Sequence, residues 1–307
     1  MKKIVVSGIS GFVGSHLASS SNEKYIVKGL SRNRDLSIGI YSYDMSEDAI
    51  NESDIVIHLA GMAHDLKNTL NERDYIEVNT LLTKQLYNQF LKSSSSVFIF
   101  MSSVKAVADR VIGVLEEEVD PLPETAYGKS KLAAENYILS QELPKNKKLI
   151  ILRPCMIHGS GNKGNLNLLY KFVKLGIPYP LASFENSRSF LSINNLIYII
   201  DKIIESKDIK SGVYNIADDK TLSTNRLIEL MGRQRQKNVM LLRIKPSLIQ
   251  CLAKLGDILH FPLNTNRLQK LTESYKVSNR KIKEALQIEK LPLTAEEGIC
   301  KTLESFN

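Results

Sequence analysis

The chain of 307 residues is 43% hydrophobic and 24% charged, a composition typical of a globular protein with one elaborated domain or two small ones. Its net charge of +8 fits a nucleic acid, an anionic membrane surface or a phosphorylated small molecule as partner, but no nucleic-acid-binding motif accompanies it, so we expect no nucleic acid. There is no apolar run long enough to span a membrane, no recognisable signal peptide and no metal or disulfide pattern among the three cysteines, so we expect a cytoplasmic protein without metal.

The predicted elements of the first half alternate between strand and helix. The expected strands are Lys3–Ser7, Tyr25–Leu30, Ile55–Leu59, Val97–Met101 and Leu149–Arg153, and the expected helices are Phe12–Ser19, Arg73–Lys92 and Ala126–Glu142. This alternation predicts an α/β fold with a parallel sheet and helices on both faces. Because such sheets bind ligands beyond the carboxyl ends of their strands, the residues that follow each strand are candidates for a site.

Three glycines spaced three residues apart follow the first strand and open the first helix. The first suits a tight turn, the second lets the backbone approach a pyrophosphate, and the third lets helix and strand pack closely. The helix amides that follow favour negative charge. The pattern therefore predicts a Rossmann-type, doubly wound sheet that binds a dinucleotide. The expected contacts are Gly8, Gly11, Phe12, Val13 and Gly14.

The pattern becomes mostly helical after about residue 160, with one clear late strand at Gly212–Ile216. We therefore expect an NAD(P)-binding domain over residues 1–160. A smaller, mostly helical substrate-binding part is expected over residues 161–307, and some of its segments can return to the sheet.

The end of the second strand bears on the choice between NAD and NADP. Ser31 and Arg32 stand there, and no carboxylate precedes Asp35. Since a basic residue accommodates a 2′-phosphate and an acidic one bonds the ribose hydroxyls, NADP(H) is favoured, while NAD(H) stays possible. Asp44 follows the next short strand and can bond the adenine. The small residues after Ile55–Leu59 let the cofactor lie against the backbone, and the contacts expected there are Leu59, Ala60 and Gly61.

A serine, a tyrosine and a lysine form the candidate catalytic group. Ser103 follows the strand Val97–Met101, and Tyr127 and Lys131 lie four apart on one predicted helix face. A free phenol titrates near 10, and we expect the neighbouring ammonium to lower the pKa of Tyr127 toward the working range. The same Tyr-x-x-x-Lys spacing recurs at Tyr170 and Tyr198, but only Tyr127 follows a strand-end Ser-Ser in the dinucleotide-binding half.

These motifs resemble the extended short-chain dehydrogenases/reductases, the NAD-dependent epimerase/dehydratase group, over nearly the whole chain. The resemblance rests on the glycines, the Ser/Tyr/Lys set, His58–Gly61, Arg153-Pro154 and Ser187–Leu191. It implies a UDP-sugar substrate and a homodimer formed through the helices Arg73–Lys92 and Ala126–Glu142. It also implies a cofactor contact at Asn79 and substrate contacts at Ser103, Asn165, Leu166, Arg188 and Arg267.

Two departures from the family's pattern narrow the expected chemistry. Dehydratases of the group carry an Asp-Glu pair where this chain has Val104 and Lys105, so 4,6-dehydration is not expected. The Val-Tyr-Gly that commonly follows is replaced by Val107-Ala108-Asp109. The stretches 102–107, 162–165 and 187–191 look most similar to reductases that act at C4 of UDP-2-acetamido-2,6-dideoxy-hexos-4-ulose in making bacterial surface polysaccharides.

The expected activity is therefore NADPH-dependent reduction of the C4 ketone of such a UDP-sugar. Two alternatives remain: a UDP-sugar 4-epimerase with tightly bound NAD, and a non-catalytic dinucleotide sensor or RNA-associated protein. Apolar residues also recur at helical spacing over 246–260, which fits packing against the substrate site or another subunit, or docking on a membrane surface.

Overall fold

The computed structural model describes residues 1–21, 24–32, 35, 39–63, 71–162, 165–259 and 264–306. Within them, seven parallel strands form one sheet in the order β10-β7-β5-β4-β1-β2-β3. The strands are β1 (Lys3–Ser7), β2 (Ile26–Leu30), β3 (Ile40–Tyr41), β4 (Ile55–His58), β5 (Val97–Met101), β7 (Lys148–Pro154) and β10 (Gly212–Ile216). The predicted doubly wound α/β fold is confirmed, and the strand order reverses beside β1, where such sheets bind their ligands.

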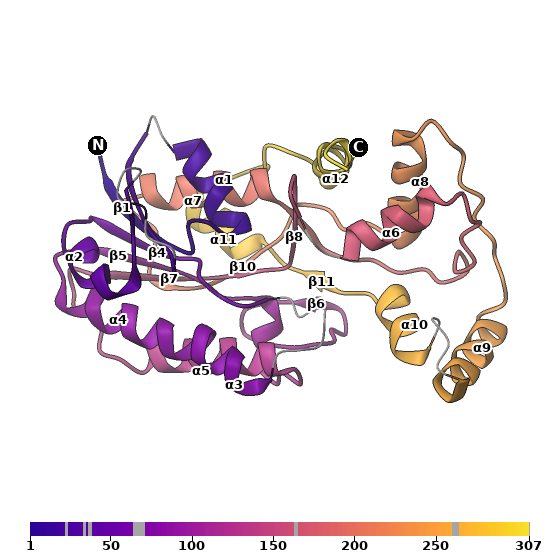
Figure 1. Cartoon of the computed structure of the whole chain (residues 1–307), viewed down its shortest axis with the longest axis horizontal. Coiled ribbons are helices and arrows are strands. Elements are labelled where there is room, and N and C mark those ends of the chain that lie inside the picture. Colours follow the sequence, from indigo (N-terminus) through magenta and orange to yellow (C-terminus); the bar gives the residue numbers. More distant parts are fainter. Residues whose placement is uncertain are drawn as a thin grey trace.

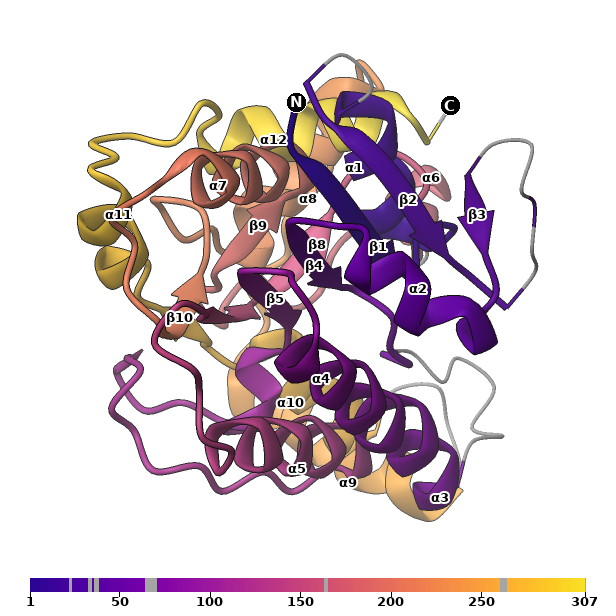
Figure 2. The same cartoon turned by 90° about the vertical axis from the view of Figure 1, so that its left-hand side faces the viewer.

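Helices cover both faces of the sheet (Figures 1 and 2). One face is covered by α2 (Ser46–Asn51), α4 (Leu82–Lys92) and α5 (Ala126–Leu139). The other is covered by α1 (Phe12–Ser21), α7 (Ile193–Glu205) and α11 (Arg280–Leu286).

The strands hold these layers together because successive side chains point to opposite faces. In β5, Phe98 and Phe100 pack with α4 and α5, whereas Ile99 and Met101 belong to the core under α1 and α7. Burial on both faces gives continuous apolar runs, which is why these strands were predictable from sequence.

The C-terminal part extends from one end of the sheet (Figure 1) and has a core of its own. Its helices are α6 (Asn165–Lys174), α8 (Thr224–Gln234), α9 (Pro246–Leu259), α10 (Thr265–Thr272) and α12 (Ala295–Glu304). Two small sheets pair β8 (Met156–His158) with β9 (Phe190–Ser192) and β6 (Val114–Leu115) with β11 (Lys276–Val277). The sequence predicted one late strand. It missed β9 and β11 because runs of two or three residues carry no measurable alternation.

The predicted helix Arg73–Lys92 is interrupted. It begins as α3 (Glu72–Tyr75), capped by Asn71, passes through a π-helical segment, η3 (Ile76–Leu81), and continues as α4. Short 3₁₀ turns, η2 (Tyr43–Met45) and η4 (Val104–Ala106), follow β3 and β5. Among the described residues, every helix is too short or too polar to cross a bilayer.

Candidate active site

The glycine turn after β1 has the geometry of a dinucleotide cradle. Gly8 adopts a φ of +72°, and a Cβ there would lie 2.7 Å from the backbone nitrogen of Ala60. A Cβ on Gly14 would lie 2.3 Å from the carbonyl oxygen of Gly8, so α1 packs directly on the turn. The helical ladder starts with Ser15 N–H bonded to Gly11 O at 2.9 Å, which leaves the preceding amides facing the helix start. These features are compatible with the pyrophosphate group that the sequence predicts at this turn, and that contact stays a prediction.

The end of β2 lies beside this turn. Ser31 is buried, with its Oγ 3.2 Å from Ser10 Oγ, while Arg32 is exposed. Burial raises the pKa of Tyr43, against the opposing effects of a hydrogen bond with the Gly8 backbone and of the Arg32 charge. Tyr43 therefore lies close to both Arg32 and the backbone of the glycine turn. The exposed Asp44 follows it in η2.

A chain of hydrogen bonds supports the loop after β4, and in this chain each side chain accepts from one neighbour and donates to the next. Thr83 donates to the carbonyl of Asn79 at 2.7 Å and so accepts from His58 Nε2 at 2.8 Å. Nδ1 of His58 then accepts from the Ser7 hydroxyl at 2.5 Å, and Ser7 accepts from the Ala60 amide at 3.3 Å. Burial, followed by the charge of Lys131, lowers the pKa of His58 to about 3, so the imidazole stays neutral.

Asn79 lies behind this loop, fully buried in the π-helical segment. Its Oδ1 accepts from the Met62 amide at 2.8 Å, and its Nδ2 donates to the Met62 carbonyl at 3.0 Å and to Ser130 Oγ at 2.9 Å. A Cβ on Gly61 would lie 2.9 Å from Lys131 Nζ. Asn79 thus fixes the loop of Leu59, Ala60 and Gly61 against the helix that carries the catalytic candidates.

Ser103 and Tyr127 are brought together as predicted. Tyr127 is half-buried, and its phenol hydrogen-bonds the Ser103 side chain. Burial raises the pKa of Tyr127, the bond to Ser103 opposes this, and Tyr75 raises it further. The expectation that Lys131 would lower this pKa is therefore wrong for the structure as it stands, and Tyr127 is a protonated phenol at neutral pH.

The position of Lys131 explains why it does not lower the pKa of Tyr127. Its ammonium donates to the carbonyl of Met101 at 2.9 Å and lies 5.0 Å from the centroid of the Phe100 ring. Burial lowers the pKa of Lys131 to about 8, although Glu135 opposes the shift. The helical spacing placed Lys131 on the correct face, but it could not show that a backbone carbonyl holds the ammonium.

A buried ion pair lies beside Ser102, and no pattern in the sequence predicts its pairing. Arg153 in β7 donates from Nε to Glu135 Oε1 at 3.0 Å and Oε2 at 3.1 Å, and Ser102 donates to the same carboxylate. Both charged side chains are almost completely buried. Together they tie the end of β5 to α5.

Asp109 links the Ser103 turn to the start of α5, the helix that carries Tyr127. Its Oδ2 accepts from the amides of Glu124 at 2.8 Å and Thr125 at 3.0 Å, just before Tyr127. Lys105 donates to the Asp109 carbonyl at 2.8 Å and lies 4.4 Å from the centroid of the Tyr275 ring. The only sequence signal for this link was that Asp109 replaces the glycine of the family pattern.

The predicted substrate residues fall into two groups. Arg188 is half-buried, and its guanidinium donates to the carbonyl of Lys270 in α10; burial lowers its pKa, and its charge acts on Lys105. Arg267 is exposed on the same helix, α10. Leu166, by contrast, has its side chain buried in the C-terminal core. The side chain of Asn165 and residues 163–164 lie outside the described part.

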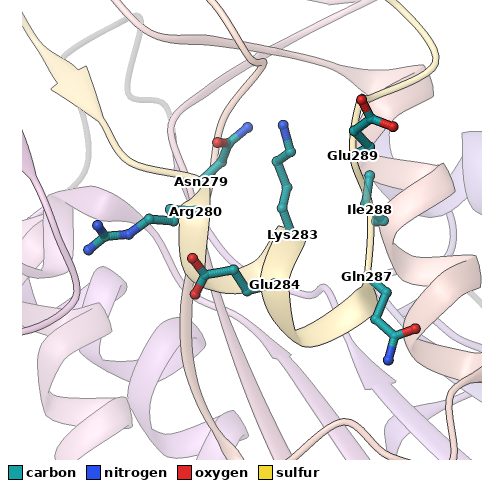
Figure 3. A pocket seen from close by; sticks show the side chains of 7 residues that line it. All are labelled: Asn279, Arg280, Lys283, Glu284, Gln287, Ile288 and Glu289. Atoms are coloured by element: carbon teal, nitrogen blue, oxygen red, sulfur yellow. The ribbon is translucent and has the colours of Figure 1, made fainter.

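A hollow along α11 is a separate feature (Figure 3). Asn279 and Lys283 point the same way and bond Asp219 Oδ1 at 3.0 Å and 2.6 Å, while Arg280 bonds Glu116 at 3.0 Å. Since its cations are already paired with carboxylates, this hollow is poorly suited to a phosphate. Within the described ranges, His, Cys, Asp and Glu side chains form no group suited to a metal ion.

A family model described as the NAD dependent epimerase/dehydratase family matches residues 4–217. The chain is 31% identical to a UDP-glucose 4-epimerase of Vibrio cholerae, over 99% of this chain and 95% of that protein. It is 26% identical to a GDP-6-deoxy-D-mannose reductase of Pseudomonas aeruginosa, over 75% and 79% of the two chains. A solved UDP-glucuronic acid 4-epimerase of Bacillus cereus, in complex with NAD, shares the fold with a TM-score of 0.75 at 20% identity, covering 99% and 98% of the two chains.

These relatives include both epimerases and reductases, so the expected similarity to C4 reductases in particular is not confirmed. The broader expectation is confirmed, because the family model spans more than two thirds of the sequence. The chain belongs to the NAD dependent epimerase/dehydratase family.

Proposed function

We propose that the chain reduces the C4 ketone of a UDP-linked 4-keto-6-deoxy-N-acetylhexosamine. The observation that carries this proposal is the hydrogen bond between the Tyr127 phenol and the Ser103 side chain, which brings a proton donor and a second hydroxyl to one place. Reduction of a ketone requires a proton donor at the carbonyl oxygen, and a phenol whose pKa is raised by burial begins the reaction with its proton in place.

A reduced nicotinamide cofactor, when bound, would supply a hydride for C4. Tyr127 donates a proton to the C4 oxygen, so one hydride and one proton convert the ketone to an alcohol. Ser103 hydrogen-bonds the same oxygen and positions it. Lys131 carries its charge beside the Gly61 backbone and supports Tyr127 once the phenol has given up its proton.

The substrate's diphosphate is assigned to Arg188, with Arg267 on α10 as a second contact. A guanidinium offers two parallel donors to phosphate oxygens. Arg188 is half-buried and its charge acts on Lys105, two residues beyond Ser103; this proximity to the candidate catalytic serine supports the assignment.

NADPH is the proposed reductant. The exposed Arg32 at the end of β2 supports it, since a guanidinium there can meet a 2′-phosphate. The neighbouring Ser31 adds a hydroxyl close to Ser10 of the glycine turn.

A second function, 4-epimerisation of a UDP-sugar, is favoured by the relative of Vibrio cholerae, which is 31% identical over almost the whole chain. The same Ser103, Tyr127 and Lys131 would serve it. An epimerase removes and returns one hydride, so it needs NAD to stay bound and consumes no cofactor.

The test follows absorbance of the reduced cofactor on addition of UDP-4-keto-6-deoxy-N-acetylglucosamine, with NADPH and NADH in parallel. The proposal predicts rapid oxidation of NADPH that is lost in Tyr127→Phe. It also predicts a preference for NADPH that weakens in Arg32→Ala, with Lys28→Ala, in the strand β2 that precedes Arg32, as the control. Absence of oxidation, together with tightly bound NAD and interconversion of UDP-glucose and UDP-galactose, would establish the epimerase instead.

A further inference from the structure

Helix α9 carries a row of apolar side chains that face solvent. Four leucines spaced at helical intervals are about half exposed, and Ile258 beside them is 72% exposed. The leucines and their exposed fractions are Leu248 (57%), Leu252 (54%), Leu255 (46%) and Leu259 (55%). We call these five residues the α9 stripe. A contiguous exposed patch of this kind marks an interaction surface more often than scattered leucines do.

The stripe is not the face by which α9 packs on the rest of the protein. Ile249, Ala253 and Gly256 are buried and form a different face of the helix. Figure 1 shows α9 beside α10, at the end of the molecule farthest from β1. The helix is therefore already anchored, and the stripe is available to something outside the folded chain.

The surroundings of the stripe are strongly basic. The segment 235–272 contains seven lysines and arginines against one acidic residue, Asp257, and so holds a net +6 of the chain's +8. Most of these cations are exposed, and Asp257 is engaged by the Thr265 amide at 3.1 Å. The exposed cations on α9, on α10 and in the segment just before α9 are Arg243, Lys245, Lys254, Arg267 and Lys270, whereas the Lys237 backbone lies against Gly232 of α8.

We propose that α9 docks on the surface of an anionic lipid bilayer. A helix that lies in the plane of such a surface buries an apolar face at the acyl boundary and places lysines and arginines near the headgroups, which is the combination found here. Lysine stems reach past the apolar face to the charged layer. The short length of α9 and its polar residues Gln250, Lys254 and Asp257 fit a helix that lies on the membrane and does not cross it.

A second copy of this chain fits the stripe less well. Pairing through α9 would bring two copies of this basic segment together, and like charges across an interface are unfavourable. An anionic surface neutralises the same charges. Charge complementarity therefore favours the bilayer over self-association.

Docking through α9 would also determine where the proposed substrate site lies relative to the membrane. Lys270 of α10, the helix beside α9, accepts the hydrogen bond of Arg188 through its carbonyl. Docking through α9 would hold the substrate-binding end of the protein close to the lipid surface.

The experiment is sedimentation with vesicles, comparing phosphatidylcholine alone with phosphatidylcholine mixed with phosphatidylglycerol. The wild-type chain is expected to bind the anionic vesicles at least about tenfold more tightly and to be released by added salt. The double variant Leu252→Asp/Leu255→Asp is expected to lose at least about tenfold of that binding. Ile112→Asp, at the fully exposed Ile112 in the loop before β6, is the matched control and should bind as the wild type does.

Folding and function are checked separately. Circular dichroism and cofactor oxidation without vesicles should be unchanged in the double variant, so that a failure of docking is distinguishable from a failure of the proposed activity. Equal sedimentation of the wild type with and without anionic vesicles would overturn the proposal. So would unchanged binding of the double variant. If the double variant converted a dimer to a monomer while the wild type ignored vesicles, the stripe would be an interface between copies.

Discussion

Substitution of Lys131 tests the electrostatics of the site most directly. Burial brings the pKa of this side chain from 10.5 in the unfolded chain to about 8 in the folded one. Each pKa unit corresponds to about 1.4 kcal/mol, so burying the ammonium opposes folding by about 3 kcal/mol at neutral pH. Between these two pKa values the unfolded state holds a proton that the folded state lacks. Raising the pH through this window therefore stabilises the wild type relative to a variant without the amine.

The assay is urea unfolding of the wild type and Lys131→Met at about pH 7 and about pH 10, with the difference in unfolding free energy taken at each pH. The lost bond to Met101 changes both values equally and cancels. The difference is expected to move in favour of the wild type by about 2–3 kcal/mol between the two pH values. A difference that stays constant within about 0.5 kcal/mol would refute a desolvated ammonium at this position.

Three further substitutions have defined outcomes. Tyr127→Phe should lower turnover by about 10²–10⁴-fold with cofactor binding intact by fluorescence titration; a turnover near that of the wild type would exclude Tyr127 as the proton donor. Asp109→Ala should lower kcat more than it changes KM, because the start of the catalytic helix loses its acceptor at Thr125, whereas Asp109→Asn should recover part of the loss; equal kinetics in both variants would contradict the link. Gly14→Ala should cost about 1–3 kcal/mol in urea unfolding and weaken dinucleotide binding, since its Cβ would meet the Gly8 carbonyl at 2.3 Å; wild-type values for both would show that the turn can yield.

Much of the fold could be predicted from sequence because the central strands are buried on both faces. The runs at Lys3–Ser7, Val97–Met101 and Gly212–Ile216 match β1, β5 and β10 residue for residue. The glycine turn was also readable, because a positive φ at Gly8 and the contact at Gly14 exclude other side chains. In both cases the constraint is local and acts on residue type.

The details of the site depended on contacts that are distant in sequence. Lys131 meets the Met101 carbonyl and Arg153 meets Glu135 across different elements, and helical spacing carries no information about such partners. The direction of the Tyr127 pKa shift was missed for the same reason: the spacing predicted an effect of Lys131, whereas burial is the largest cause of the shift and raises the pKa. The strands β9 and β11 were missed because they are too short for a periodic signal.

At Ile76–Leu81 the helix departs from regular α-helical winding, at the place where it supports the candidate site. Such a segment widens one turn of a helix, as if a single residue had been inserted there, so that each side chain beyond it is rotated about the axis. Because of that rotation Asn79 can reach Met62 while Thr83 reaches His58. Deleting one residue from this segment would restore ordinary helical winding and turn one of the two contacts away. The π-helical turn therefore lets one helix make both contacts. An uninterrupted α-helix would support the loop after β4 less well.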